Sequence, residues 1–162
     1  MCSLNLGDFN ISSNKIQICD PSYKLGDSGT LTINNALNGK YFASFEVEDN
    51  FIANLHICHQ KYSNSILEFE KFGDIYFDSG QAGFFDFNFF VKNQGGTFDD
   101  VSSFYGTSCA ITLSPKQAGI INNFGVISSS GFGDGRYDVF VAKNINEKIV
   151  AAFISFIELE VF

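Results

Sequence analysis

Two short segments carry most of the residues that could bind a ligand. DSGQAGFFD spans residues 78–86, and SGFGDGRYD spans residues 130–138. Both combine glycines, which let the backbone approach a ligand closely, with carboxylates, which are oxygen ligands for hard cations. Because polar loops on a rigid scaffold are where sites are usually built, we expect both segments to converge on one rim of a sheet. The candidate ligand-binding residues are Asp78, Gln81, Asp86, Asp134, Arg136 and Tyr137.

A purely structural role would account for the same residue types. Asp134 followed by Gly135 is a common hairpin-turn dipeptide, and Gly131 and Gly133 would suit a tight or bulged connection. Arg136 could close the acidic cluster as an internal ion pair, which needs no ligand. The sequence leaves both interpretations open, a binding site or a pair of turns.

Three further residues are chemically reactive but do not form a recognisable site. His56, Cys58 and His59 are potential zinc ligands. In a strand, the first two face one side and His59 the other, so the three cannot converge on one ion without a bend. The same geometry argues against a catalytic pair of cysteine and histidine.

The sequence contains no phosphate-binding loop, dinucleotide fingerprint, zinc-protease helix, nucleophile elbow or EF-hand loop. It therefore favours a non-enzymatic binding or interaction module of unknown ligand that needs no cofactor. The alternative is a metal-assisted hydrolase or divalent-metal-binding protein that uses the two acidic glycine-rich segments. We expect a protein partner, and the oligomeric state stays open.

Charge and cysteine spacing limit the partners and the cellular compartment expected for the protein. Eighteen acidic residues against ten basic ones give a net charge of −8, which argues against binding nucleic acid or anionic lipid. No apolar run is long enough to cross a membrane, and the N-terminal residues do not resemble an export signal. The four cysteines are widely spaced, so we expect reduced thiols in a soluble cytoplasmic protein.

The chain of 162 residues fits a single domain, residues 1–162. Its 20 Phe and 6 Tyr favour β structure. Short apolar alternations are separated by turn-forming residues, which predicts a mainly β fold: a single antiparallel β-sandwich or partly closed barrel with little helix. The predicted strands cover residues 16–18, 31–33, 40–47, 51–59, 65–69, 74–77, 125–129, 137–142 and 148–157.

Several connections are predicted from the same patterns. A loop is expected over 20–29, a hairpin turn over 48–50 and a surface loop over 93–100. The phenylalanine-rich run 83–91 is predicted to be irregular or helical, capped by Asp78 or Ser79. Ser114 followed by Pro115 predicts the start of a short helix. The last three strands are predicted to form a meander whose final strand is central and covered on both faces, because that strand is apolar on both alternating sides.

Three motifs in a fixed order also resemble a known family. They are DPSY at residues 20–23, DSGQAGFFD, and GVISSSGFGDGRYDVFVAKN at 125–144 followed by an apolar strand. Together they resemble a bacterial and phage-associated family of unknown function, and the resemblance covers residues 16–157. The family often has Cys where this chain has Ser22, and the nearby thiol here is Cys19. The resemblance implies a β-rich fold and no particular activity. Its motif positions are Asp20, Pro21, Tyr23, Asp78, Gly80, Gln81, Gly83, Asp86, Gly131, Gly133, Asp134, Gly135 and Tyr137.

Overall fold

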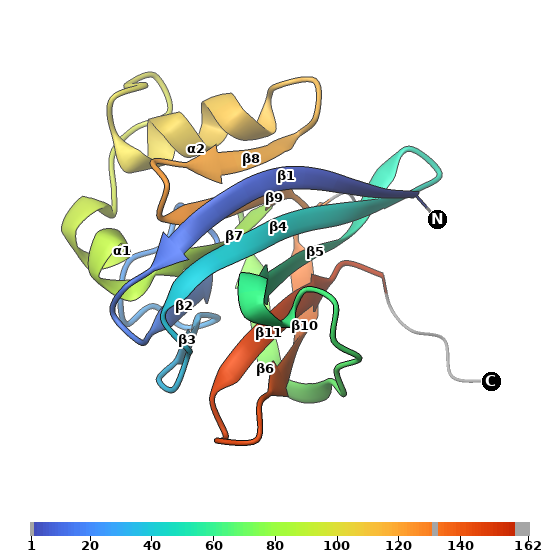
Figure 1. Ribbon diagram of the computed structural model, residues 1–162. Helices are drawn as coiled ribbons and strands as arrows, with labels where there is room; N and C mark the ends of the chain where they lie inside the picture. The colour runs from blue at the N-terminus through green and yellow to red at the C-terminus, as the bar shows by residue number, and fades with distance from the viewer. Residues whose placement is uncertain (1, 131–132, 158–162) are drawn as a thin grey trace.

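The computed structural model describes residues 2–130 and 133–157, and their strands form two antiparallel sheets (Figure 1). The large sheet contains, in spatial order, β1 (Cys2–Ile11), β4 (Gly39–Glu48), β5 (Phe51–His59), β11 (Ile149–Ser155), β10 (Gly135–Lys143) and β6 (Glu70–Phe77). The small sheet contains β3 (Leu31–Ile33), β2 (Ile16–Cys19), β7 (Gln81–Asp86), β9 (Gly125–Ser129) and β8 (Ala118–Ile121). The predicted mainly β, sandwich-like class with little helix is confirmed, and the described strands form no closed barrel.

The molecule has three layers because the small sheet is covered on both faces. Ala82 and Phe84 of β7 face the large sheet and join the main core. The side chain of Phe85 points to the opposite face of the small sheet. There its ring packs against those of Phe90 and Phe104, with centroid distances of 5.7 and 5.1 Å. These two rings belong to α1 (Phe87–Asn93) and α2 (Phe104–Thr112), which lie on the side of the small sheet away from the large one (Figure 1). None of the helices in residues 2–130 and 133–157 is long and apolar enough to cross a membrane.

The helices differ in position from those predicted. In the run 83–91, the chain continues as β7 as far as Asp86, whose side chain then caps α1 by accepting a 3.2 Å hydrogen bond from the Phe89 amide. Asp78 and Ser79 are therefore not the cap. The helix expected after Ser114 is also wrong, because α2 is capped by Ser103 and ends before that position.

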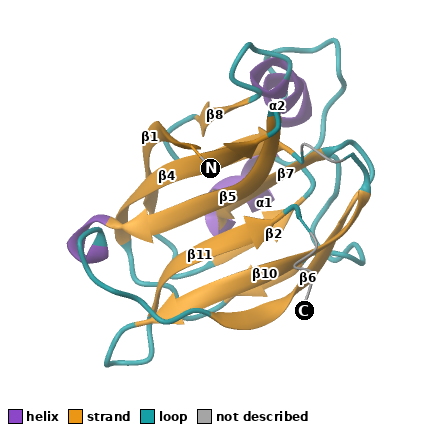
Figure 2. Cartoon of the chain, turned by 90° about the vertical axis from the view of Figure 1, so that its right-hand side faces the viewer, coloured by secondary structure: helices purple, strands orange, loops and turns teal. Residues whose placement is uncertain are grey.

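The strand predicted over 65–69 is absent, and this segment forms a different feature. We call residues 63–69 the strap. It leads from the short 3-10 helix η1 (Gln60–Tyr62) to β6. Because β11 and β10 lie between β5 and β6 in the large sheet, the connection has to pass across them (Figure 2). The strand predicted over 74–77 begins earlier, at Glu70, so residues 71–73 lie inside β6 and do not separate two strands.

The C-terminal strands are placed correctly but are paired differently from the prediction. β9 belongs to the small sheet, so the three strands do not form a meander, and only β10 and β11 pair as a hairpin. β11 is central, between β5 and β10, as predicted. The β4–β5 hairpin is also confirmed, and its turn residues Asp49 and Asn50 have φ angles of 52° and 68°, which suit the twist of a two-residue hairpin turn.

Candidate functional site

A buried aspartate locks two of the sequence motifs together. Asp20 follows β2, and its side chain is fully buried. Its Oδ1 accepts hydrogen bonds from the Ser22 amide at 2.8 Å and the Ser79 hydroxyl at 2.6 Å. Its Oδ2 accepts from the amides of Asp78 and Ser79, both at 2.8 Å. The DPSY loop therefore fixes the conformation of the turn that leads from β6 into β7.

The second acidic segment meets this turn. β10 pairs with β6 so that Gly135 lies opposite Phe77, which places Asp134 and Asp78 at the same end of the two strands. The Ser130 amide donates to the Gly80 carbonyl at 2.8 Å. Asp134 Oδ1 is 3.8 Å from the point that a Cβ atom on Gly80 would occupy. The structure thus brings Asp78 and Asp134 together, while Gly131 lies outside the described residues.

Asp86 does not join this rim. It is at the other end of β7 from Gln81, about 16 Å away at the usual rise of a strand. Its carboxylate accepts hydrogen bonds from the Ser12 amide at 2.9 Å and from the Ser13 amide and hydroxyl at 3.0 and 2.7 Å. Asp86 therefore fixes the turn after β1 and the start of α1, and the expectation that it lies beside Asp134 is wrong.

Arg136 and Tyr137 are close to the rim and lie on opposite faces of β10. The Arg136 guanidinium lies 3.6 Å from Asp74 and stacks over the Tyr76 ring at 4.3 Å, so its ion pair is with β6 and not with the two loop carboxylates. The Tyr137 hydroxyl donates to the Gly133 carbonyl at 3.1 Å. Its ring packs against Phe77, with centroids 5.1 Å apart. These two residues support the rim structurally.

Asp78 and Asp134 are the exposed carboxylates of the rim. Within the described residues, neither forms an ion pair with a base. The neighbouring Tyr23 hydrogen-bonds with Asp78, and partial burial, this bond and the charges of the surrounding carboxylates raise the pKa of Tyr23 well above its usual range. Tyr23 is therefore a neutral side chain that hydrogen-bonds one of the two carboxylates. We call Tyr23, Asp78, Gly80 and Asp134 the acidic rim.

A polar network beneath the acidic rim connects it to α2. Gln81 is 5% exposed, and its Oε1 accepts a 2.9 Å hydrogen bond from the Thr112 hydroxyl. Its Nε2 donates to the Ser79 hydroxyl at 3.2 Å and the Cys109 sulfur at 3.6 Å. Tyr105 hydrogen-bonds with Cys109 and Ser79, and burial first, then its bond to Cys109, raises the pKa of its phenol. Sequence reasoning missed the partners from α2, because nothing in the helix sequence points toward Gln81.

A hollow of about 420 Å³ opens beside this network. It is bounded by the 79–81 turn, the C-terminal end of α2 and the chain around β8 and β9. The described lining residues are Ser79, Gly80, Gln81, Thr112, Leu113, Ser114, Pro115, Gln117 and Ser129. All are uncharged, and the end of α2 presents the negative end of the helix dipole. Together with Asp134 next to Gly80, this arrangement favours a positively charged group.

His56, Cys58 and His59 do not converge on one site, and none of them lies at the rim. His59 lies on the inner side of β5, where its Nδ1 accepts from the Lys61 amide at 3.1 Å, while His56 and Cys58 lie on the outer side. Cys19, Cys58 and Cys109 are free thiols. Over residues 2–130 and 133–157, no three His, Cys, Asp or Glu side chains are grouped so that they could hold a metal ion.

Comparison with protein-family models, with curated proteins and with solved structures finds no match to this chain. The resemblance carried by the three motifs therefore stays a prediction. What the structure adds is that one part of each motif meets at the same place, with Asp20 buried at the centre and the carboxylates of Asp78 and Asp134 facing solvent, whereas Asp86 lies apart.

Proposed function

We propose that this protein is a non-enzymatic binding module that holds a basic side chain of a protein partner at the acidic rim. The observation that carries the proposal is the pair of exposed carboxylates, Asp78 and Asp134, at the same end of β6 and β10. No described base neutralises either of them. A cationic group placed between them would relieve their mutual repulsion and pair with both.

The hollow next to the rim suits the remainder of such a side chain. Leu113 and Pro115 line it together with hydroxyl and amide groups. Lysine and arginine bury their methylene stems against apolar surface while the charged head keeps polar partners. The planar fork of arginine matches carboxylate geometry better than the compact ammonium of lysine does, so arginine is the preferred ligand. The net charge of −8 would also steer a basic partner toward the protein.

The hydrogen bonds of the rim argue for binding rather than catalysis. The Ser79 hydroxyl donates to Asp20, which is an acceptor and not a base aimed at a substrate. Among the described residues that bond to Ser79, none is a histidine or lysine that could activate its oxygen. No observation favours the metal-dependent alternative. Because Cys19, Cys58 and Cys109 are free thiols, we place the partner in the reducing cytoplasm.

Titration of the ¹⁵N-labelled protein with three tripeptides tests the proposal. The peptides are acetyl-Gly-Arg-Gly-amide, its neutral glutamine counterpart and its glutamate counterpart. We expect the arginine peptide alone to shift the amide signals of Ser79, Gly80, Ser130 and Gly135 in a saturable way. Equal shifts with the glutamine peptide, or shifts spread evenly over acidic loops such as 99–100, would contradict a specific site at the rim.

A further inference from the structure

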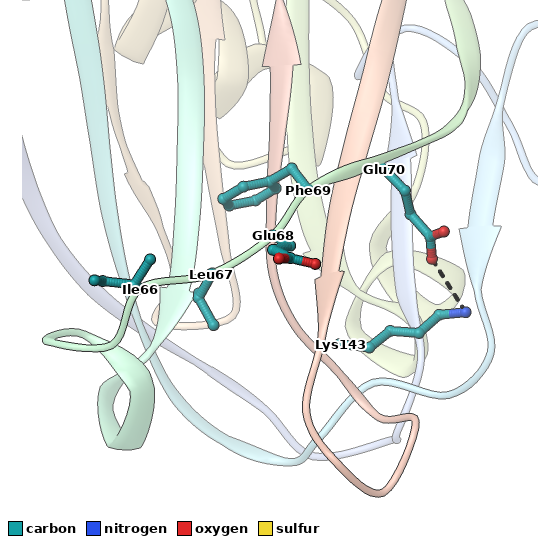
Figure 3. A pocket seen from close by; sticks show the side chains of 6 residues that line it. All are labelled: Ile66, Leu67, Glu68, Phe69, Glu70 and Lys143. Carbon is teal, nitrogen blue, oxygen red and sulfur yellow. Dashed lines mark ion pairs between the residues drawn. The ribbon is translucent and has the colours of Figure 1, made fainter.

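A second hollow lies at the opposite end of the large sheet from the acidic rim. β6 runs from Glu70 at the strap to Phe77 at the rim, a distance of about 23 Å at the usual rise of a strand. The hollow has a volume of about 510 Å³. Figure 3 shows the strap side chains that line it, which leave the chain in different directions, and the ion pair between Glu70 and Lys143. The lining residues are Ile66, Leu67, Glu68, Phe69, Glu70 and Lys143.

The walls of this strap hollow are held in place from several sides. The Phe69 ring packs edge-on against Phe153 of the large sheet, with centroids 5.0 Å apart. Lys143, at the end of β10, forms a 3.3 Å ion pair with Glu70. Asn144, in the next turn, donates a 3.1 Å hydrogen bond to the Tyr62 hydroxyl just before the strap. The contacts thus fasten the chain to the sheet at Tyr62, just before the strap, and at Phe69 and Glu70, where the strap ends.

Apolar side chains of the strap are exposed where they could contact a partner. Ile66 is fully exposed, and Phe69 is 39% exposed although its ring touches Phe153. Leu67 between them is half-buried. Single exposed apolar residues are ordinary on protein surfaces. Here, Ile66, Leu67 and Phe69 occupy three of four consecutive positions beside the charged lining residues Glu68, Glu70 and Lys143. We call these three side chains the apolar wall.

The charges of the hollow select the kind of partner. Glu70 is neutralised by Lys143, whereas Glu68 forms no ion pair or hydrogen bond with any described residue. Two carboxylates and one ammonium leave one uncompensated negative charge beside the apolar wall. An anionic lipid surface is disfavoured by that charge, and a second copy of this acidic chain would be repelled by the net charge of −8.

We infer that the strap hollow docks a segment of another protein in which a lysine or arginine adjoins large aliphatic side chains. The aliphatic groups pack on Ile66 and Leu67, and the basic group pairs with Glu68. This surface is separate from the acidic rim and does not depend on ligand binding there. A partner that used both surfaces would have to span the length of β6 and β10.

Defined peptides test this assignment on the full chain. Acetyl-Leu-Lys-Leu-amide, its glutamine counterpart and acetyl-Ser-Lys-Ser-amide are titrated into ¹⁵N-labelled protein. The first peptide is expected to shift the amide signals of residues 66–70 and 143–144, and the other two to bind more weakly. Glu68→Gln should lower the affinity for the first peptide about two- to fivefold, the range of an exposed ion pair. Ile66→Ser should lower it by a similar factor.

Matched controls change the same residue types elsewhere. Asp99→Asn and Val101→Ser lie in an exposed loop and should leave the affinity unchanged. Equal binding of the lysine and glutamine peptides, or no shift at residues 66–70 at millimolar peptide, would overturn the inference. So would shifts at these residues that arise with phosphatidylcholine vesicles or with rising protein concentration in place of the peptide, because the surface would then bind a membrane or a second copy.

Discussion

The Ser79 hydroxyl donates a 2.6 Å hydrogen bond to the carboxylate of Asp20, 59 residues earlier in the chain. The same carboxylate accepts the amides of Asp78 and Ser79, so one buried anion defines the turn that presents Asp78. Hydrogen bonds to a charged acceptor are stronger than neutral ones, and their loss is costly when the partner groups stay buried. The geometry of the acidic rim therefore depends on a residue that no ligand touches.

Replacing Asp20 should unfold the protein more readily. In Asp20→Asn, an amide group replaces one oxygen and faces donors that it cannot satisfy, so we expect the free energy of unfolding to fall by about 2–4 kcal/mol. Urea denaturation measures this change. The control is Asp27→Asn in the same loop, where an exposed carboxylate accepts a single amide hydrogen bond from Lys24. Equal losses for the two variants would contradict the anchoring role of Asp20.

Asp86 should matter for stability and not for binding. Asp86→Ala removes the acceptor for Ser12 and Ser13 and the cap of α1, so we expect a loss of about 2–4 kcal/mol in the free energy of unfolding. The affinity for the arginine peptide should be unchanged in the folded variant. The comparison variant Asp100→Ala removes a carboxylate that caps an exposed turn, and its loss should be clearly smaller. A weaker affinity of the Asp86→Ala variant for the arginine peptide would indicate that Asp86 contributes to the binding site.

Gly83 should tolerate no side chain. A Cβ atom there would lie 2.5 Å from the Phe85 ring and 2.6 Å from the carbonyl oxygen of Val126, a backbone atom that cannot move aside. Gly83→Ala should cost about 1–3 kcal/mol, equivalent to a fall of several degrees in the melting temperature. Gly119→Ala is the control, because its Cβ would meet only one methyl group of Ile111 at 3.0 Å. Equal decreases in the melting temperatures of the two variants would contradict the close approach of β7 and β9.

Lower pH should weaken the fold through His56. Burial of its imidazole lowers the pKa of His56, and the Glu46 carboxylate 3.6 Å away opposes this only in part. The unfolded chain, with an ordinary histidine pKa of about 6.5, then binds more protons, so stability falls as the pH drops below that value. Urea denaturation at pH 7.5 and 5.5 should show a smaller fall for His56→Gln than for the unaltered protein. An NMR titration that gave His56 a pKa above 6.5 would contradict the predicted direction of the pH effect.

Local pattern predicted much of the sheet structure and failed where burial was unusual. The pattern predicted β9 with its observed bounds. Helix α2 was missed because its buried side carries Gly106, Ser108, Cys109 and Thr112, which give no apolar helical period. The strap was mistaken for a strand because Ile66, Leu67 and Phe69 resemble one. Which sheet a strand joins depends on contacts between distant residues, so the meander was also wrong.

The candidate site was predictable only at its turns. Turn chemistry was predicted only for Asp134 and Gly135, whereas Asp78 was expected to cap a helix; the proximity of Asp78 and Asp134 follows from the pairing of β6 with β10. Asp86 was misplaced because the motif containing it includes a whole strand, which carries it to the far end of β7. The hydrogen bond from Thr112 to Gln81 joins residues 31 positions apart, and neither residue type reveals it.

Asp78 and Asp134 are proposed to bind a basic side chain together. The most direct measurement is the dissociation constant of acetyl-Gly-Arg-Gly-amide for the unaltered protein and for the double variant Asp78→Asn, Asp134→Asn. Asparagine at position 78 keeps an oxygen that can accept the Tyr23 hydroxyl, and urea denaturation verifies that the variant is folded. The matched control, Glu48→Gln with Asp99→Asn, changes the net charge equally at exposed positions elsewhere.

We expect at least about a fivefold weaker affinity for the Asp78 and Asp134 double variant, since two exposed ion pairs are lost. The control should stay within twofold of the unaltered protein, and added salt should weaken binding to the unaltered protein more than binding to the double variant. Equal affinities for the folded double variant and the control would contradict the claim, because binding would then follow net charge and not the acidic rim.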